Sequence, residues 1–73
     1  MEFSKDVFAA RLRSKRAEAD LSQEALAEKA GINKDTIVKY EGALRVPGSD
    51  TLVKLAEALC CTPDQLLGWP SRQ

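Results

Sequence analysis

Apolar residues recur along this 73-residue chain at the three- and four-residue intervals of amphipathic helices. Phe8 and Leu12 share one face of a segment that follows Ser4, a good N-cap, so we expect a first helix over about residues 5–19. No stretch of useful length alternates between apolar and polar residues, as a half-buried strand would. The pattern therefore predicts an all-α fold.

Two short helices joined by a tight turn are predicted in the centre of the chain. Ser22 is placed to cap the first helix, and Gly31 follows its last turn, where a helix can end in the left-handed region. Asn33 is placed to cap the second helix, whose inner face carries Ile37 and Tyr40. A short turn with glycine between two such helices is typical of the helix-turn-helix unit, whose second helix enters the major groove of DNA.

Two further helices are predicted after a loop that ends at Pro47. The fourth helix spans about residues 49–59 and carries its leucines on one face. Thr62 caps the fifth helix, Pro63 occupies its first position, and Gly68 ends it. The prediction is a compact domain of five helices.

Chain length indicates one domain over residues 1–68, followed by a C-terminal tail at 69–73. A core this small is marginally stable alone, and oligomerisation often supports such domains. No segment approaches the roughly 18 apolar residues of a membrane span, and the N-terminus lacks the apolar centre of a signal peptide. We therefore expect neither membrane association nor export.

The two cysteines, Cys60 and Cys61, are adjacent. A bridge between neighbours would be strained, so we expect reduced thiols and a cytoplasmic location. Cys61 is interpreted as a small core residue and Cys60 as the end of a helix. With no histidine in the chain, neither a metal site nor a cofactor is expected.

Charge does not by itself indicate a nucleic-acid partner, because 11 basic residues balance 11 acidic ones. DNA-binding domains usually carry a basic surface. Neutrality predicts weak non-specific binding, since counterion release scales with the number of phosphates neutralised.

The chain resembles the phage repressor and Cro-like helix-turn-helix family over roughly residues 5–68. The resemblance rests on five motifs in family order and spacing: Arg11-Leu12-Arg13-x-x-Arg16, Ser22-Gln23-x-x-Leu26-Ala27-x-Lys29-x-Gly31-Ile32, Thr36-Ile37-x-x-Tyr40-Glu41, Pro47-x-x-x-Thr51-Leu52-x-Lys54-Leu55-Ala56-x-Ala58-Leu59 and Pro63-Asp64-x-Leu66-Leu67-Gly68. Two departures concern loops. Gly42 and Ala43 stand where the family has a polar residue and then glycine, which predicts a helix-ending turn shifted by one residue. Cys60 stands where glycine or asparagine often ends the fourth helix.

The outward arc of the second central helix carries Lys34, Asp35, Val38 and Lys39. The resemblance implies that this arc reads bases. Lysine suits guanine O6 and N7, aspartate can accept a hydrogen bond from cytosine N4, and valine suits a thymine methyl group. The alternative is an ordinary solvated face, which any amphipathic helix has.

The resemblance also implies contacts to the DNA backbone. They would come from Arg16, Ser22, Gln23, Asn33 and Arg45. For Gln23 the alternative is a helix former at a first turn, and for Asn33 the capping role is the safer interpretation.

Arg16 and Glu41 occupy positions that pair between helices one and three in the family. The resemblance therefore implies a structural ion pair. The alternative is two separate surface charges that contribute little to stability.

Leu66, Leu67 and Trp69 form an apolar cluster near the C-terminus. In the family this end of the domain commonly forms the dimer contact, so the resemblance implies a homodimer joined through this cluster. The alternative is that all three side chains fold back onto helices one and four.

These observations predict a sequence-specific DNA-binding transcriptional regulator, a repressor, that binds double-stranded DNA as a homodimer. Catalysis is not expected, because no nucleophile stands in a recognisable motif with a base. The alternative is a protein-interaction module of the same fold, such as an antitoxin-like partner. Zero net charge and acidic Asp35 favour that alternative.

Overall fold

The computed structural model describes residues 4–68, and every regular element in that range is a helix. The helices are α1 (Lys5–Glu18), α2 (Gln23–Ala30), α3 (Lys34–Glu41), α4 (Ser49–Ala58) and α5 (Pro63–Leu67). The predicted all-α fold of five helices is confirmed. The tail predicted at 69–73 lies outside the described residues.

Three of the five described helices start at side-chain caps predicted from the sequence. Ser4 and Ser22 each accept a hydrogen bond from the amide three residues later, at 3.3 and 3.0 Å. Thr62 and Gln65 form a reciprocal capping box at the start of α5. These bonds satisfy amides that the helix itself leaves free, so each start is determined locally.

Helix exits use the left-handed region, in most cases without glycine. Gly31 (φ 73°) ends α2, and Asp20 (φ 59°) follows α1 as expected. Ala43 (φ 60°) and Cys60 (φ 55°) adopt the same conformation after α3 and α4. The left-handed residue after α3 is thus Ala43, the position where the family has glycine, while Gly42 stays at φ −90°. The predicted one-residue shift of this turn is therefore wrong, and the conformation costs about 1 kcal/mol for a residue with a Cβ.

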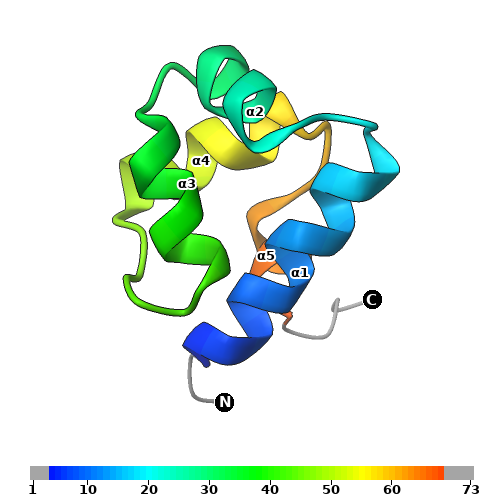
Figure 1. Cartoon of the computed structure of the whole chain (residues 1–73). Helices are drawn as coiled ribbons and strands as arrows, with labels where there is room; N and C mark the ends of the chain where they lie inside the picture. The colour runs from blue at the N-terminus through cyan, green and yellow to red at the C-terminus, as the bar shows by residue number, and fades with distance from the viewer. Residues whose placement is uncertain (1–3, 69–73) are drawn as a thin grey trace.

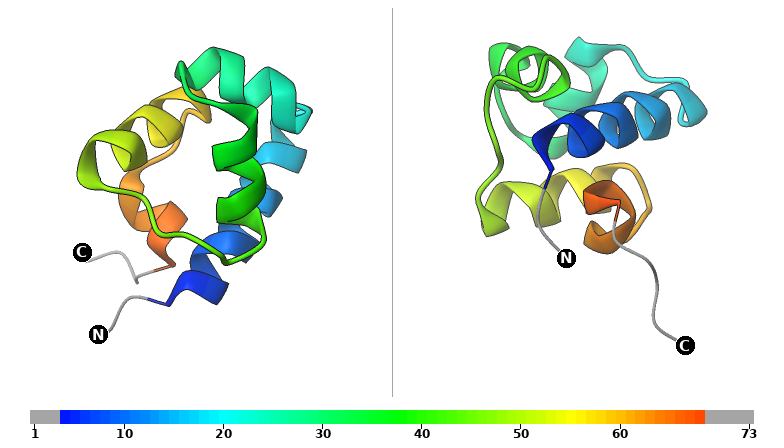
Figure 2. Two further views of the ribbon diagram at one scale, coloured as in Figure 1. Left: turned by 60° about the vertical axis from the view of Figure 1, so that its left-hand side comes forward. Right: turned by 90° about the horizontal axis from the view of Figure 1, so that it is seen from below.

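The helices enclose one core (Figure 1). Viewed from below, α1 lies between the α2–α3 pair and the α4–α5 pair (Figure 2, right). Contacts join α1 to both α3 and α5, and α2 to both α3 and α4. The α2–α3 unit is therefore supported from behind by α1 and α4, which leaves its outer surface free.

The centre of the core consists of six large apolar side chains that solvent does not reach. They are Phe8, Leu12, Leu26, Ile37, Leu55 and Leu66. Half-buried Cys61 packs against this core, whereas Cys60 is exposed. The burial of Leu66 corrects one expectation, because a side chain with no exposed surface cannot form a dimer contact.

Candidate nucleic-acid interface

Helix α3 presents one buried face and one solvent face. Ile37 is 0% and Tyr40 is 4% exposed, and the Tyr40 ring packs edge-on against Phe8 with centroids 5.8 Å apart. Lys34 and Val38 are exposed on the other side. The helix is thus fixed to the core through one face, and its predicted reading arc is open to a partner.

Two residues of the arc neutralise each other. Lys39 Nζ lies 3.1 Å from Asp35 Oδ2, one helical turn away. Their side chains are 43% and 70% exposed, so the pair is a surface interaction that a polar partner can replace. Within residues 4–68 Lys34 forms no ion pair, which leaves it as the arc's uncompensated cation.

The implied ion pair between Arg16 and Glu41 is present. Arg16 Nε donates to Glu41 Oε2 at 2.6 Å, and Nη2 donates to Oε1 at 3.0 Å. The Glu41 side chain is only 4% exposed. The hydrogen bond to Glu41 and its negative charge raise the pKa of Arg16, against the opposing effect of burial. This bidentate, largely desolvated pair joins α1 to the end of α3.

Glu41 also accepts a hydrogen bond from the side chain of Gln23. Gln23 Nε2 donates to Glu41 Oε1 at 3.1 Å, and Arg16 Nη1 donates to the Leu21 carbonyl at 2.9 Å. The carboxylate therefore ties the first turn of α2 to α1 and α3 together. Arg16, Gln23 and Glu41, which are far apart in sequence, form one network.

Arg13 also belongs to this junction, although its place in the sequence did not indicate a contact with α3. Its Nη1 donates to the main-chain carbonyl of Glu41 at 2.6 Å, where the last carbonyls of α3 lack helical partners. Arg13 lies one turn before Arg16 on α1, so the spacing between them already indicated a shared side of the helix. The missing signal was the position of α3, which tertiary packing supplies.

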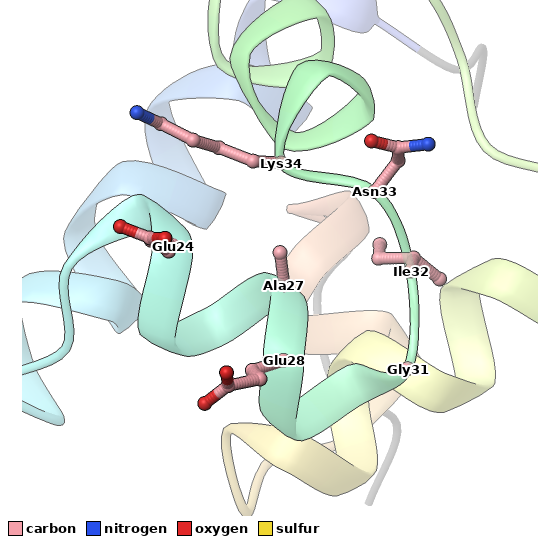
Figure 3. A pocket seen from close by; sticks show the side chains of 7 residues that line it. All are labelled: Glu24, Ala27, Glu28, Gly31, Ile32, Asn33 and Lys34. Atoms are coloured by element: carbon pink, nitrogen blue, oxygen red, sulfur yellow. The ribbon is translucent and has the colours of Figure 1, made fainter.

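Asn33 departs from its predicted capping role. Its backbone stands at the N-cap of α3, but its exposed side chain makes no capping hydrogen bond. Asn33 and Lys34 line a surface pocket of about 510 Å³ between α2 and α3, together with Glu24 and Glu28. Lys34 and Glu24 extend to the same side of this pocket (Figure 3). The amide of Asn33 is thus available for contacts outside the domain.

The loop between α3 and α4 is exposed. Arg45 lies in it, and its apolar neighbours Leu44 and Val46 are 72% and 53% exposed. From the predicted dimer cluster, Leu67 is half-buried and Trp69 lies outside the described residues. Leu44 and Val46, the two most exposed of the large apolar side chains in the described domain, therefore lie beside α3, where the sequence pattern did not indicate them.

Among residues 4–68, no group of three or more histidine, cysteine, aspartate or glutamate side chains is placed to hold a metal ion. In the same range no helix is long and apolar enough to cross a membrane.

Comparison with known proteins identifies this arrangement. A family model described as a helix-turn-helix domain matches residues 7–68, which is most of the chain. The chain belongs to the helix-turn-helix domain family. It is 37% identical over 51 residues to the cryptic phage CTXphi transcriptional repressor RstR of Vibrio cholerae, and 38% identical over 58 residues to the HTH-type transcriptional regulator ImmR of Bacillus subtilis. These matches cover 70% and 80% of this chain, which spans just under half (46%) of each relative.

Solved structures show the same helical arrangement. The restriction-modification controller protein C.AhdI from Aeromonas hydrophila superimposes with a TM-score of 0.82 at 34% identity, covering 85% of this chain and 94% of that one. The P22 c2 repressor, crystallised in complex with a synthetic operator, gives 0.78 at 32% identity, covering 82% and 91%. The similarity therefore extends over more than four-fifths of this chain and more than nine-tenths of each of those structures.

Proposed function

We propose that this domain binds double-stranded DNA in a sequence-specific manner, with α3 in the major groove. The observation that carries the proposal is the division of α3 into a face sealed in the core and an arc whose side chains are exposed or partly exposed to solvent. The P22 c2 repressor, which has the same fold, was crystallised with an operator. Lys34, Asp35, Val38 and Lys39 are the proposed base contacts.

The proposed backbone contacts surround this arc. Ser22 and Gln23 stand at the start of α2, where free amides and the helix dipole favour a phosphate. Asn33 has an uncommitted side chain, and Arg45 is exposed in the loop after α3. Arg16 and Glu41 act indirectly, because their network fixes the side chain of Gln23 and the end of α3.

We infer that the domain regulates transcription as a repressor. RstR and the P22 c2 protein are both named as repressors. The proposed action is occupancy of a DNA site rather than catalysis, and it places the protein in the cytoplasm. Because the proposed action consists only of binding contacts, the quantity to measure is the ratio of specific to non-specific DNA affinity.

We further propose that two copies bind one operator. Paired half-sites lie about 34 Å apart along the DNA, and the domain extends 33 Å along its longest axis. Neighbouring copies would therefore meet through side chains at their edges. Leu44 and Val46 are the exposed apolar side chains beside α3, and we assign the contact to them, with Leu67 as the remaining described candidate from the C-terminal cluster.

The decisive experiment selects bound sites from a random pool of duplex DNA and then titrates salt against the selected site. Sequence-specific binding predicts an enriched motif, often palindromic, and an affinity that falls steeply with salt. Absence of any enriched motif, with no salt dependence, would instead support a protein-interaction module. Lys34→Ala separates the outcomes further, because a reading residue changes the motif whereas a solvated one does not.

A further inference from the structure

Two adjacent cysteines line a surface pocket that lies outside the proposed DNA interface. Cys60 is exposed and Cys61 is half-buried, and both are free. They follow the last turn of α4 and line a pocket of about 380 Å³, to which α1, α2 and α5 also contribute. None of the residues that line this pocket belongs to α3. The pocket is thus separate from the proposed DNA surface.

Cationic side chains line the same pocket as the thiols. Lys15 of α1 and Lys29 of α2 both line it, together with a single carboxylate, Glu18. Lys15 Nζ lies 3.6 Å from Glu18 Oε1, and among the described residues Lys29 forms no ion pair. The excess of positive charge disfavours a metal cation and favours a small anionic molecule.

Cys60 is the more exposed of the two thiols. Its amide donates to the Glu57 carbonyl at 3.2 Å, which holds the left-handed turn in place with the side chain exposed. Burial raises the pKa of the Cys61 thiol, although the charge of Lys15 acts in the opposite direction. Burial therefore disfavours the thiolate of Cys61, and the thiolate is the nucleophile in exchange reactions.

The two sulfurs are poorly placed to bridge each other. Neighbouring Cα atoms across a trans peptide lie about 3.8 Å apart, whereas disulfide-linked residues usually lie about 4.4–6.8 Å apart. An adduct on Cys60 would therefore not be displaced readily by Cys61. It would persist until an external thiol removed it.

We propose that Cys60 is a site of S-thiolation by a small thiol that bears carboxylates. The Cys60 thiolate attacks one sulfur of the corresponding symmetrical disulfide, RSSR. A new bond forms between Cys60 Sγ and that sulfur, the original S–S bond breaks, and RS⁻ leaves and takes up the proton that Cys60 lost. Lys15 and Lys29 bind the carboxylates of the attached group.

The test uses the full 73-residue chain and three disulfides of different charge: anionic glutathione disulfide, neutral bis(2-hydroxyethyl) disulfide and cationic cystamine. Adduct formation is followed by intact mass and located by peptide mapping. Each rate is divided by that of a small model thiol with the same disulfide. The normalised rate should be about tenfold higher for the anionic disulfide than for the neutral one, and lowest for the cationic one.

Matched variants isolate the pocket. Cys60→Ser should abolish the adduct, and Cys61→Ser should retain it. The double variant Lys15→Gln/Lys29→Gln should lose the preference for the anionic disulfide, whereas Lys54→Gln, on the exposed side of α4, should keep it. Circular dichroism confirms that each variant is folded. Modification at Cys61, equal normalised rates, or a preference unaffected by the paired lysine change would overturn the proposal.

Discussion

Glu41 accepts two hydrogen bonds from the guanidinium of Arg16, at 2.6 and 3.0 Å, while its own side chain is almost sealed from solvent. The same carboxylate accepts a third bond from Gln23, and the Glu41 carbonyl accepts one from Arg13. Glu41, at the end of α3, thus links three helices that are separate in the sequence: α1, α2 and α3. This junction holds the end of α3, the proposed reading helix, against α1 and the start of α2.

Glu41→Ala should lower the free energy of unfolding by about 3–5 kcal/mol, because it leaves the Arg16 guanidinium partly buried without a counter-charge. Urea denaturation of the parent, Glu41→Ala, Arg16→Ala and the double variant gives the coupling energy directly. Glu18→Ala, which breaks the exposed pair with Lys15, should cost about 1 kcal/mol or less. A coupling energy near zero would show that the pair does not stabilise the domain.

Lys34→Ala should relax base preference at one or two positions of each half-site and cost about 1–3 kcal/mol on the preferred sequence. Lys34 is the cation of the reading arc that has no carboxylate partner in the described domain, so it is free to reach a guanine edge. Lys54→Ala removes the same charge from α4 and should leave base preference intact. Identical selected motifs for the parent and Lys34→Ala would rule out a reading role.

Asp35→Asn should raise affinity for unrelated duplex DNA and reduce the ratio of specific to non-specific binding. The substitution removes a negative charge from the arc and releases Lys39, whose Nζ lies 3.1 Å from the Asp35 carboxylate, so about one more phosphate contact becomes available. Fluorescence anisotropy across a salt series measures both effects. Asp50→Asn on α4 removes the same charge elsewhere, and an equal gain there would point to net charge alone.

Leu44→Ser combined with Val46→Ser should weaken cooperative binding to a two-half-site operator while leaving binding to a single half-site nearly unchanged. Both side chains are exposed, so their loss should alter the contact between copies rather than the core. Leu67→Ser tests the other candidate contact in the same assay. If only Leu67→Ser reduces cooperativity, with no fall in melting temperature, the contact belongs to the end of α5.

Cys61 should make the free energy of unfolding depend on pH in the alkaline range, where a thiol ordinarily loses its proton. Burial raises the folded-state pKa of Cys61 from 9.0, so the folded chain retains a proton that the unfolded chain releases. The free energy of unfolding should therefore fall as pH rises past about 9, whereas at lower pH both states hold the proton. Urea denaturation between about pH 7 and 10, in the presence of reductant, should show a smaller decline for Cys61→Ala. Parallel pH profiles for the two proteins would contradict this.

Helix boundaries that depend only on neighbouring residues could be predicted from the sequence. Ser4, Ser22 and Thr62 cap their helices because a hydroxyl can reach the amide three residues on, whatever the rest of the chain does. The exit at Gly31 also follows from local backbone preference, whereas the left-handed residue after α3 is Ala43 although glycine precedes it. The spacing of the motifs was sufficient to recognise the family. The helical period was sufficient to predict which residues of α3 are buried and which are exposed.

Tertiary structure alone decided which distant side chains meet. The Arg16–Glu41 pair was expected from family resemblance only, and the Arg13 bond to the Glu41 carbonyl was not expected at all, because both require the position of α3 against α1. Leu66 illustrates the same limit. Its apolar character fits a core or a contact surface equally well, and only the packing of α5 against α1 and α4 removes it from solvent. Local patterns specify helices and their inner faces, whereas pairings between helices depend on angles and distances that no short stretch of sequence encodes.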